Sequence, residues 1–247
     1  MNRIQLADLP PQPVTKPNSA ALNHVDSQLR YNLFGPIHYE ANYAYPLLIW
    51  LHGTDSDESQ LQEVMPLISV RNYVGVAPAA PNCWQEDEHG WHQSQSGIEQ
   101  AERDVMEAIR IASQRFHVGE RKVYLAGYRS GGTMALRLGL RQPGFFAGAA
   151  CLGGPFPHGD TPFRHLGDAR GLPMLIGVGE ESEEYPTSQL CEDIKLFHAA
   201  GMHATIRQYS CGDELNQVML RDLNAWIMEH VTGIPSGERD TKFWNAN

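Results

Sequence analysis

The sequence predicts a single α/β domain built on a mostly parallel β-sheet of seven or eight strands. The chain has 247 residues, of which 42% are hydrophobic. This length suits one large core and is short for two domains of typical size. From about residue 29 onwards, short apolar runs alternate with longer segments whose apolar residues recur every three or four positions. That alternation is typical of β-α units, whose helices cover both faces of the sheet and give three layers.

Seven apolar runs are predicted to be strands, because strands buried on both faces are apolar along most of their length. They span residues 29–34, 45–51, 73–77, 122–126, 146–152, 173–178 and 203–209. Amphipathic helices are predicted over residues 57–70, 98–116, 131–140, 189–200 and 214–231. The last helix has the clearest apolar stripe, and Gly233 and Pro235 after it are typical of a helix end.

The two ends of the chain lack this pattern. Residues 1–26 are rich in proline and polar side chains and are predicted to form an irregular arm. Residues 233–247 are predicted to be a polar tail. The domain itself is therefore assigned to residues 27–232.

Charge and cysteine content limit the partners that we expect. Lys and Arg total 19 against 29 for Asp and Glu, a formal charge of -10, which disfavours nucleic acid and anionic membranes as partners. No apolar run approaches the roughly 20 residues of a membrane-spanning helix, and no apolar signal-peptide segment follows Met1. The four cysteines are widely spaced without a C-x-x-C pair, so we expect reduced thiols in a soluble cytoplasmic protein.

Two segments carry most of the functional information. In the first, the apolar run at 45–51 leads into His-Gly-Thr at residues 52–54 and then into a predicted helix. In the second, the apolar run at 122–126 leads into Gly-Tyr-Arg-Ser-Gly-Gly at residues 127–132 and another helix. A strand, a glycine-rich turn and a helix in this order are the context of a nucleophile elbow.

Together these segments resemble the carboxylesterase/phospholipase branch of the α/β-hydrolase superfamily, which includes acyl-protein thioesterases and dienelactone-hydrolase-like esterases. The resemblance runs from about residue 31 to residue 231 and implies the α/β-hydrolase fold. In that family the turn reads G-x-S-x-G-G, with small residues two before and two after the nucleophilic serine. Here the small residues are Gly127 and Gly131, which places Arg129 at the nucleophile position.

Arg129 cannot attack an acyl group, because its guanidinium stays protonated and offers no lone pair. Ser130 beside it would be flanked by Tyr128 and Gly132, and a tyrosine would crowd the bend. The geometry of the turn therefore favours residue 129 over residue 130 as the nucleophile position.

The other two triad positions also depart from the family pattern. The family acid follows the next strand as G-x-x-D, and residues 179–182 read G-E-E-S, which places Ser182 there. The neighbouring Glu181 and Glu183 are alternative acids. The family histidine follows a glycine after the last strand, where this chain has Asp213. A carboxylate with an ordinary pKa near 3.9 is a poor base for a serine hydroxyl.

Three departures at three separate motifs predict a catalytically degenerate serine-hydrolase homologue with no catalytic residues and a ligand- or protein-binding role. We hypothesise that Arg129 and Asp213 form a salt bridge, since a cation at a helix N-terminus is otherwise unfavourable. The resemblance further implies an oxyanion hole made by the backbone N–H groups of Thr54 and Ser130. A small anionic or ester-like ligand could bind there beside Arg129.

Two other interpretations stay open: an active carboxylesterase/phospholipase-type hydrolase that uses Ser130 with Asp213 and Glu181 or Glu183, and a structural or oligomer subunit. The loop at 81–92, which contains Trp91, is expected to line the cleft. Its Glu86, Glu88, His89 and His92 lack a strong zinc spacing, so no metal or cofactor is expected. Family relatives often dimerise, so the resemblance allows a homodimer.

Overall fold

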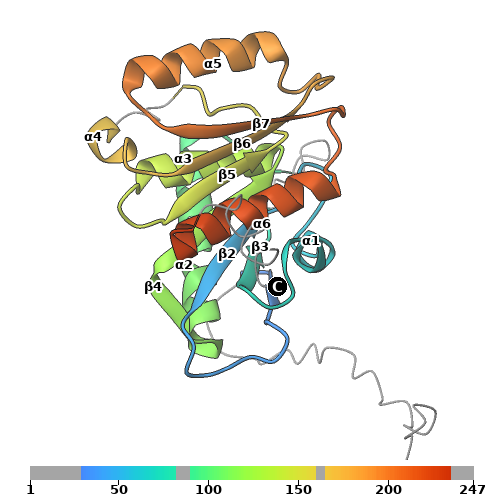
Figure 1. Cartoon of the computed structure of the whole chain (residues 1–247). Helices are drawn as coiled ribbons and strands as arrows, with labels where there is room; N and C mark the ends of the chain where they lie inside the picture. Colours follow the sequence, from blue (N-terminus) through green and yellow to red (C-terminus); the bar gives the residue numbers. More distant parts are fainter. Residues whose placement is uncertain (1–28, 82–89, 160–164, 235–247) are drawn as a thin grey trace, which may run out of the picture.

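The computed structural model describes residues 29–81, 90–159 and 165–234, and its centre is one seven-stranded sheet with helices on both faces (Figure 1). The strand order is β1-β3-β2-β4-β5-β6-β7. Strand β1 is antiparallel to β3, and all other neighbouring strands are parallel. The strands are β1 (Tyr31–Phe34), β2 (Tyr45–Leu51), β3 (Val74–Pro78), β4 (Val118–Tyr128), β5 (Gly148–Leu152), β6 (Met174–Gly179) and β7 (Ala204–Tyr209). The predicted sheet is confirmed.

The five predicted helices are also present, with a short additional one. The helices are α1 (Gln60–Ile68), α2 (Gln95–Arg115), α3 (Ser130–Arg141), α4 (Leu166–Ala169), α5 (Thr187–Ala200) and α6 (Gln217–Thr232). Helix α4 has four residues, too few to show a helical period in the sequence. Helix α1 begins three residues later than predicted, because Asp57 Oδ1 accepts the Ser59 backbone N–H and forms a turn there.

Residues of the sheet alternate between two hydrophobic cores. Leu47, Ile49 and Leu51 of β2 pack into the core beneath α2, α3 and α5, whereas Leu48 and Trp50 pack into the core beneath α1 and α6. All five side chains are fully buried, which explains the apolar sequence of this central strand. The two cores hold the carboxyl ends of β2 and β4 at the middle of the sheet, where the two glycine-containing turns emerge.

Helix α3 is buried along most of its length, and its Arg137 ties two loops to the same edge of the sheet. Arg137 Nε donates to Gln93 Oε1 over 2.6 Å, and Arg137 Nη2 donates to the His158 carbonyl over 2.5 Å. These bonds anchor the segment before α2 and the loop after β5. Within the described ranges, no helix is both long and apolar enough to cross a membrane.

Candidate functional site

Arg129 lies at the tip of the turn between β4 and α3 in a strained backbone conformation. Its φ is 49° and its ψ is -123°. Among non-glycine residues of the described ranges, His38 and Asp55 are the others with positive φ. Such a conformation costs on the order of 1–3 kcal/mol and is found mainly at functional sites. A sharp, strained strand-to-helix turn is the geometry of a nucleophile elbow.

Gly127 and Gly131 show why this turn needs small residues on either side of its tip. A Cβ on Gly131 would collide with the carbonyl oxygens of Leu51 and His52, and a Cβ on Gly127 would lie 2.5 Å from the carbonyl carbon of Gly131. These obstacles are backbone atoms, which cannot rotate away as a side chain can. The elbow and the end of β2 therefore pack backbone against backbone.

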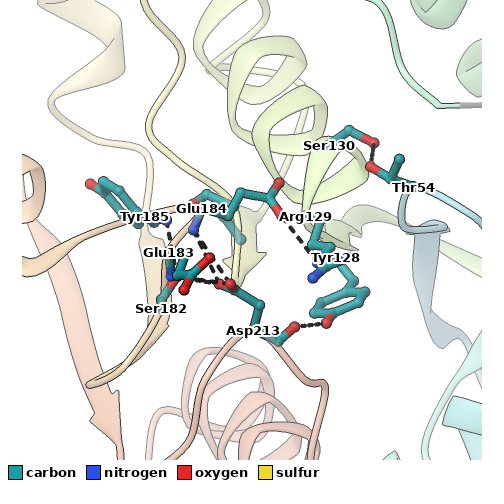
Figure 2. A network of polar contacts seen from close by, with 11 residues as sticks. Thr54, Tyr128, Arg129, Ser130, Ser182, Glu183, Glu184, Tyr185 and Asp213 are labelled. Atoms are coloured by element: carbon teal, nitrogen blue, oxygen red, sulfur yellow. Dashed lines mark hydrogen bonds and ion pairs between the residues drawn. The ribbon is translucent and has the colours of Figure 1, made fainter. Parts of the chain in front are cut away.

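The guanidinium of Arg129 forms an ion pair with Glu184 (Figure 2). The predicted salt bridge between Arg129 and Asp213 is therefore wrong, because Glu184 is the partner. Arg129 Nε lies 3.0 Å from Glu184 Oε2, and the two side chains are 29% and 32% exposed. Arg129 Nε is itself buried, and among the described residues no acceptor lies in hydrogen-bonding geometry to it. The contact is thus an ion pair without a hydrogen bond. The guanidinium carbon also lies 5.6 Å from the centre of the Tyr128 ring.

Asp213 has a different partner because the segment after β6 wraps its carboxylate. The Ser182 hydroxyl donates to Asp213 Oδ1, and the backbone N–H groups of Glu183 and Glu184 also donate to this carboxylate. Burial alone would raise the pKa of Asp213, but these hydrogen bonds outweigh it and hold the pKa below its usual value. The Tyr128 hydroxyl donates to the backbone carbonyl of Asp213. Asp213 is therefore ionised and already bonded at neutral pH.

Ser182 is buried and bonded on both sides. Its hydroxyl donates to Asp213 and accepts the backbone N–H of Tyr185 over 2.9 Å. The structure thus brings together the two residues that the sequence assigned to the acid and histidine positions. Glu184 was not predicted as a site residue, because the family spacing points to position 182 and its immediate neighbours and not to a glutamate two positions further on.

Ser130 and Thr54 face each other across the elbow. The Thr54 hydroxyl donates to Ser130 Oγ over 3.1 Å, and a Cβ on Gly90 would lie 3.0 Å from the same Ser130 oxygen. Because α3 begins at Ser130, the N–H groups of its first turn have no partner within the helix. The two residues predicted to supply the oxyanion hole are therefore neighbours at the start of α3.

His52 supports the turn after β2 and has no free ring nitrogen. The Ala80 backbone N–H donates to its Nε2 over 3.0 Å, so the proton lies on Nδ1, which is 2.9 Å from the Gly53 carbonyl oxygen. The side chain is 3% exposed, and this burial lowers its pKa. Trp91 Nε1 donates to the His52 carbonyl over 3.1 Å. Trp91 was expected to line the cleft, but it is 3% exposed and packs inside the protein against this turn.

A polar pocket of about 610 Å³ adjoins the elbow at the carboxyl ends of β2 and β3. Gly90 lines this pocket and also lies against Ser130. Its charged lining residues are Arg30, Asp55, Asp57 and Glu58. Arg30 donates two hydrogen bonds to Glu58, over 3.1 and 2.8 Å, which leaves the two aspartates as net negative charge.

The sequence candidates for a metal site are Glu86, Glu88, His89 and His92. Glu86, Glu88 and His89 lie outside the described residues. Within the described residues, no three His, Cys, Asp or Glu side chains are grouped as metal ligands.

The chain has the α/β-hydrolase fold, which it shares with solved carboxylesterases. The carboxylesterase of Bacillus cereus superposes with a TM-score of 0.65 at 14% identity, covering 83% of this chain and 96% of that one. The carboxylesterase of Mesorhizobium loti gives 0.63 at 22% identity, covering 83% and 97%. The phospholipase/carboxylesterase of Dyadobacter fermentans gives 0.61 at 17% identity, covering 81% and 96%. The predicted fold is confirmed.

Similarity at the level of sequence is more limited. No protein-family model matches the chain. A curated protein of Nocardia uniformis subsp. tsuyamanensis, named "Putative esterase NocK", is 29% identical over 141 residues. That match covers 55% of this chain and 39% of the length of the curated relative.

Proposed function

We propose that this chain is a catalytically degenerate serine-hydrolase homologue that acts by binding a ligand. The observation that carries the proposal is the side chain at the tip of the elbow. Residue 129 has the strained φ of 49° expected of a nucleophile, yet it is an arginine. A guanidinium has no nucleophilic lone pair and stays protonated in proteins, so this turn cannot form an acyl-enzyme.

The chemistry of Ser182 and Asp213 supports the same conclusion. A triad needs a neutral base beside the nucleophile and an ionised acid behind that base. Here the pair consists of a hydroxyl and a carboxylate whose pKa is held low by its hydrogen bonds. Such a carboxylate is a weak base, and its oxygens already accept hydrogen bonds from Ser182 and from the backbone.

Two other nucleophiles can be considered in the same region. Ser130 Oγ accepts a hydrogen bond from Thr54, and no histidine is bonded to it within the described residues. Cys211 has its pKa raised, first by burial and then by Glu214, which disfavours the reactive thiolate. Neither residue has the activating base that nucleophilic catalysis requires.

The polar pocket next to the elbow supports a binding role at this edge of the sheet, although Arg129, Ser130 and Thr54 are not among its lining residues. A volume of about 610 Å³ is within the range of ligand sites. A homodimer and a cytoplasmic location stay predictions from the sequence.

A fluorophosphonate probe and a panel of p-nitrophenyl esters test the loss of chemistry. We expect the wild-type chain to remain unlabelled by intact-mass spectrometry and to hydrolyse the esters no faster than buffer. Labelling that maps to Ser130 and disappears in Ser130→Ala would establish a displaced nucleophile. That result would replace this proposal with an active hydrolase.

A further inference from the structure

We propose that Arg129 binds the carboxylate group of a small monocarboxylate ligand, and that Glu184 is an internal carboxylate which occupies this position until the ligand displaces it. The inference rests on the proposed function, because it requires the elbow to serve binding. It adds the chemical class of the ligand and a competing residue of the chain itself.

The first support is an unused donor. Arg129 Nε is buried and lies 3.0 Å from Glu184 Oε2, but among the described residues it donates no hydrogen bond. A buried donor whose N–H is not aligned with an acceptor is unfavourable. A ligand carboxylate placed in line with this N–H would form the charge-assisted bond that Glu184 does not form.

The second support is that the Glu184 side chain can leave without a change in the backbone. The Glu184 backbone N–H donates to Asp213, which fixes the segment after β6 at this point. The Glu184 side chain, by contrast, is 32% exposed, and in the described part of the chain Arg129 is the basic group that its carboxylate contacts. Figure 2 shows the Glu184 side chain extending from this segment toward the elbow. Freeing Arg129 therefore requires breaking this ion pair but none of the backbone hydrogen bonds of Glu184.

The third support is the negative charge already present around Arg129, which favours a ligand with a single negative charge. Asp213 and Asp55 lie close enough to Glu184 to raise its pKa. Exchange of the Glu184 carboxylate for a ligand carboxylate leaves the charge around Arg129 unchanged. A phosphate dianion would bring an additional negative charge toward the same two aspartates. The geometry therefore favours a monocarboxylate over a phosphate.

The environment of Glu184 also gives the expected pH dependence. Burial is the main cause that raises its pKa, Arg129 opposes it, and Asp213 and Asp55 add to it. The other titratable groups facing it, Tyr128 and Cys151, have raised pKa values and stay neutral near pH 7. As pH falls toward the raised pKa, Glu184 takes up a proton and competes less for Arg129. Monocarboxylate binding should therefore tighten as the pH is lowered from 7.5 toward the raised pKa of Glu184.

Sodium butyrate is the probe for this site, with binding measured by isothermal titration calorimetry at pH 7.5. If Glu184 occupies Arg129 about nine-tenths of the time, Glu184→Gln should bind butyrate about tenfold more tightly than wild type. Glu184→Ala should change affinity in the same direction. The matched control is Glu183→Gln, which removes the same charge one residue away and keeps the backbone N–H on Asp213. It should bind butyrate as wild type does.

The double variant Arg129→Met with Glu184→Gln removes both charges together and should lose butyrate binding, with circular dichroism confirming that it is folded. Equal affinities of wild type and both Glu184 variants would overturn the inference, as would butyrate binding by the folded double variant. Tighter binding of inorganic phosphate than of butyrate would overturn the ligand class. An unlabelled wild type without these butyrate responses refutes this inference alone, whereas fluorophosphonate labelling of wild type refutes the proposed function.

Discussion

Ser182 and Asp213 lie 31 positions apart in the chain, and the Ser182 hydroxyl donates a hydrogen bond to Asp213 Oδ1. The two residues are on the loops after β6 and β7, which are neighbouring parallel strands. In an active hydrolase the acid and the histidine would make the corresponding contact. Under the proposed function, this hydrogen bond stands where that contact would be, with a hydroxyl and a carboxylate in place of the acid and the histidine.

This contact predicts that changes at the two positions are coupled. Ser182→Asp alone would place a second carboxylate against the ionised Asp213 and should lower the free energy of unfolding by about 1–3 kcal/mol at pH 7. Adding Asp213→His should restore most of the loss, because the imidazole can pair with the new carboxylate. Urea denaturation of wild type, Ser182→Asp, Asp213→His and the double variant gives the coupling energy. Additive effects would show that the two positions do not act as a pair.

The backbone packing at the elbow predicts an unusual response to alanine. Alanine normally stabilises a helix relative to glycine. Gly131→Ala should instead lower the free energy of unfolding by about 1–3 kcal/mol, because the added Cβ would collide with the carbonyl oxygens of Leu51 and His52. Gly144 has no atom within 4 Å of a built Cβ, so Gly144→Ala is the matched control and should stay within about 0.5 kcal/mol. Both are measured by urea denaturation. A neutral Gly131→Ala would refute this account of the turn.

His52 predicts a loss of stability in mild acid. Burial lowers its pKa in the folded chain below the ordinary value of 6.5. Below pH 6.5 the unfolded chain therefore binds more protons than the folded one, so the free energy of unfolding falls as pH falls. His52→Gln keeps an acceptor for the Ala80 N–H and should flatten the pH dependence between pH 6.5 and pH 5. The exposed His203, replaced by Gln, is the control, and an equal flattening there would contradict the role given to His52.

Much of the fold could be predicted from the sequence because burial leaves a clear pattern. The bounds of β2 coincide with the prediction, since both of its faces are covered. Strand β4 begins at Val118, four residues before the predicted start, because Val118 pairs with Tyr45 across an irregularity in register. That extension depends on a partner strand 73 positions away and not on local apolar content.

The sequence predicted the backbone turn of the candidate site, but it did not predict the side-chain contacts made there. Spacing of Gly127 and Gly131 was enough to place Arg129 at the tip of the turn. The partner of Arg129 was not predictable, because the choice between Glu184 and Asp213 is made by hydrogen bonds that wrap Asp213 in the folded chain. Trp91 was expected in the cleft but is buried, since its indole N–H finds an acceptor inside, at the His52 carbonyl.

The most direct test of the central claim is fluorophosphonate labelling, read by intact-mass spectrometry, of wild type beside the triple variant Arg129→Ser, Ser182→Asp and Asp213→His. Loss of chemistry within a retained geometry predicts an unmodified wild type and a triple variant that carries one label on the introduced residue at position 129. A wild-type chain that takes up the label would contradict the account, because it would show that the natural sequence still holds an activated nucleophile.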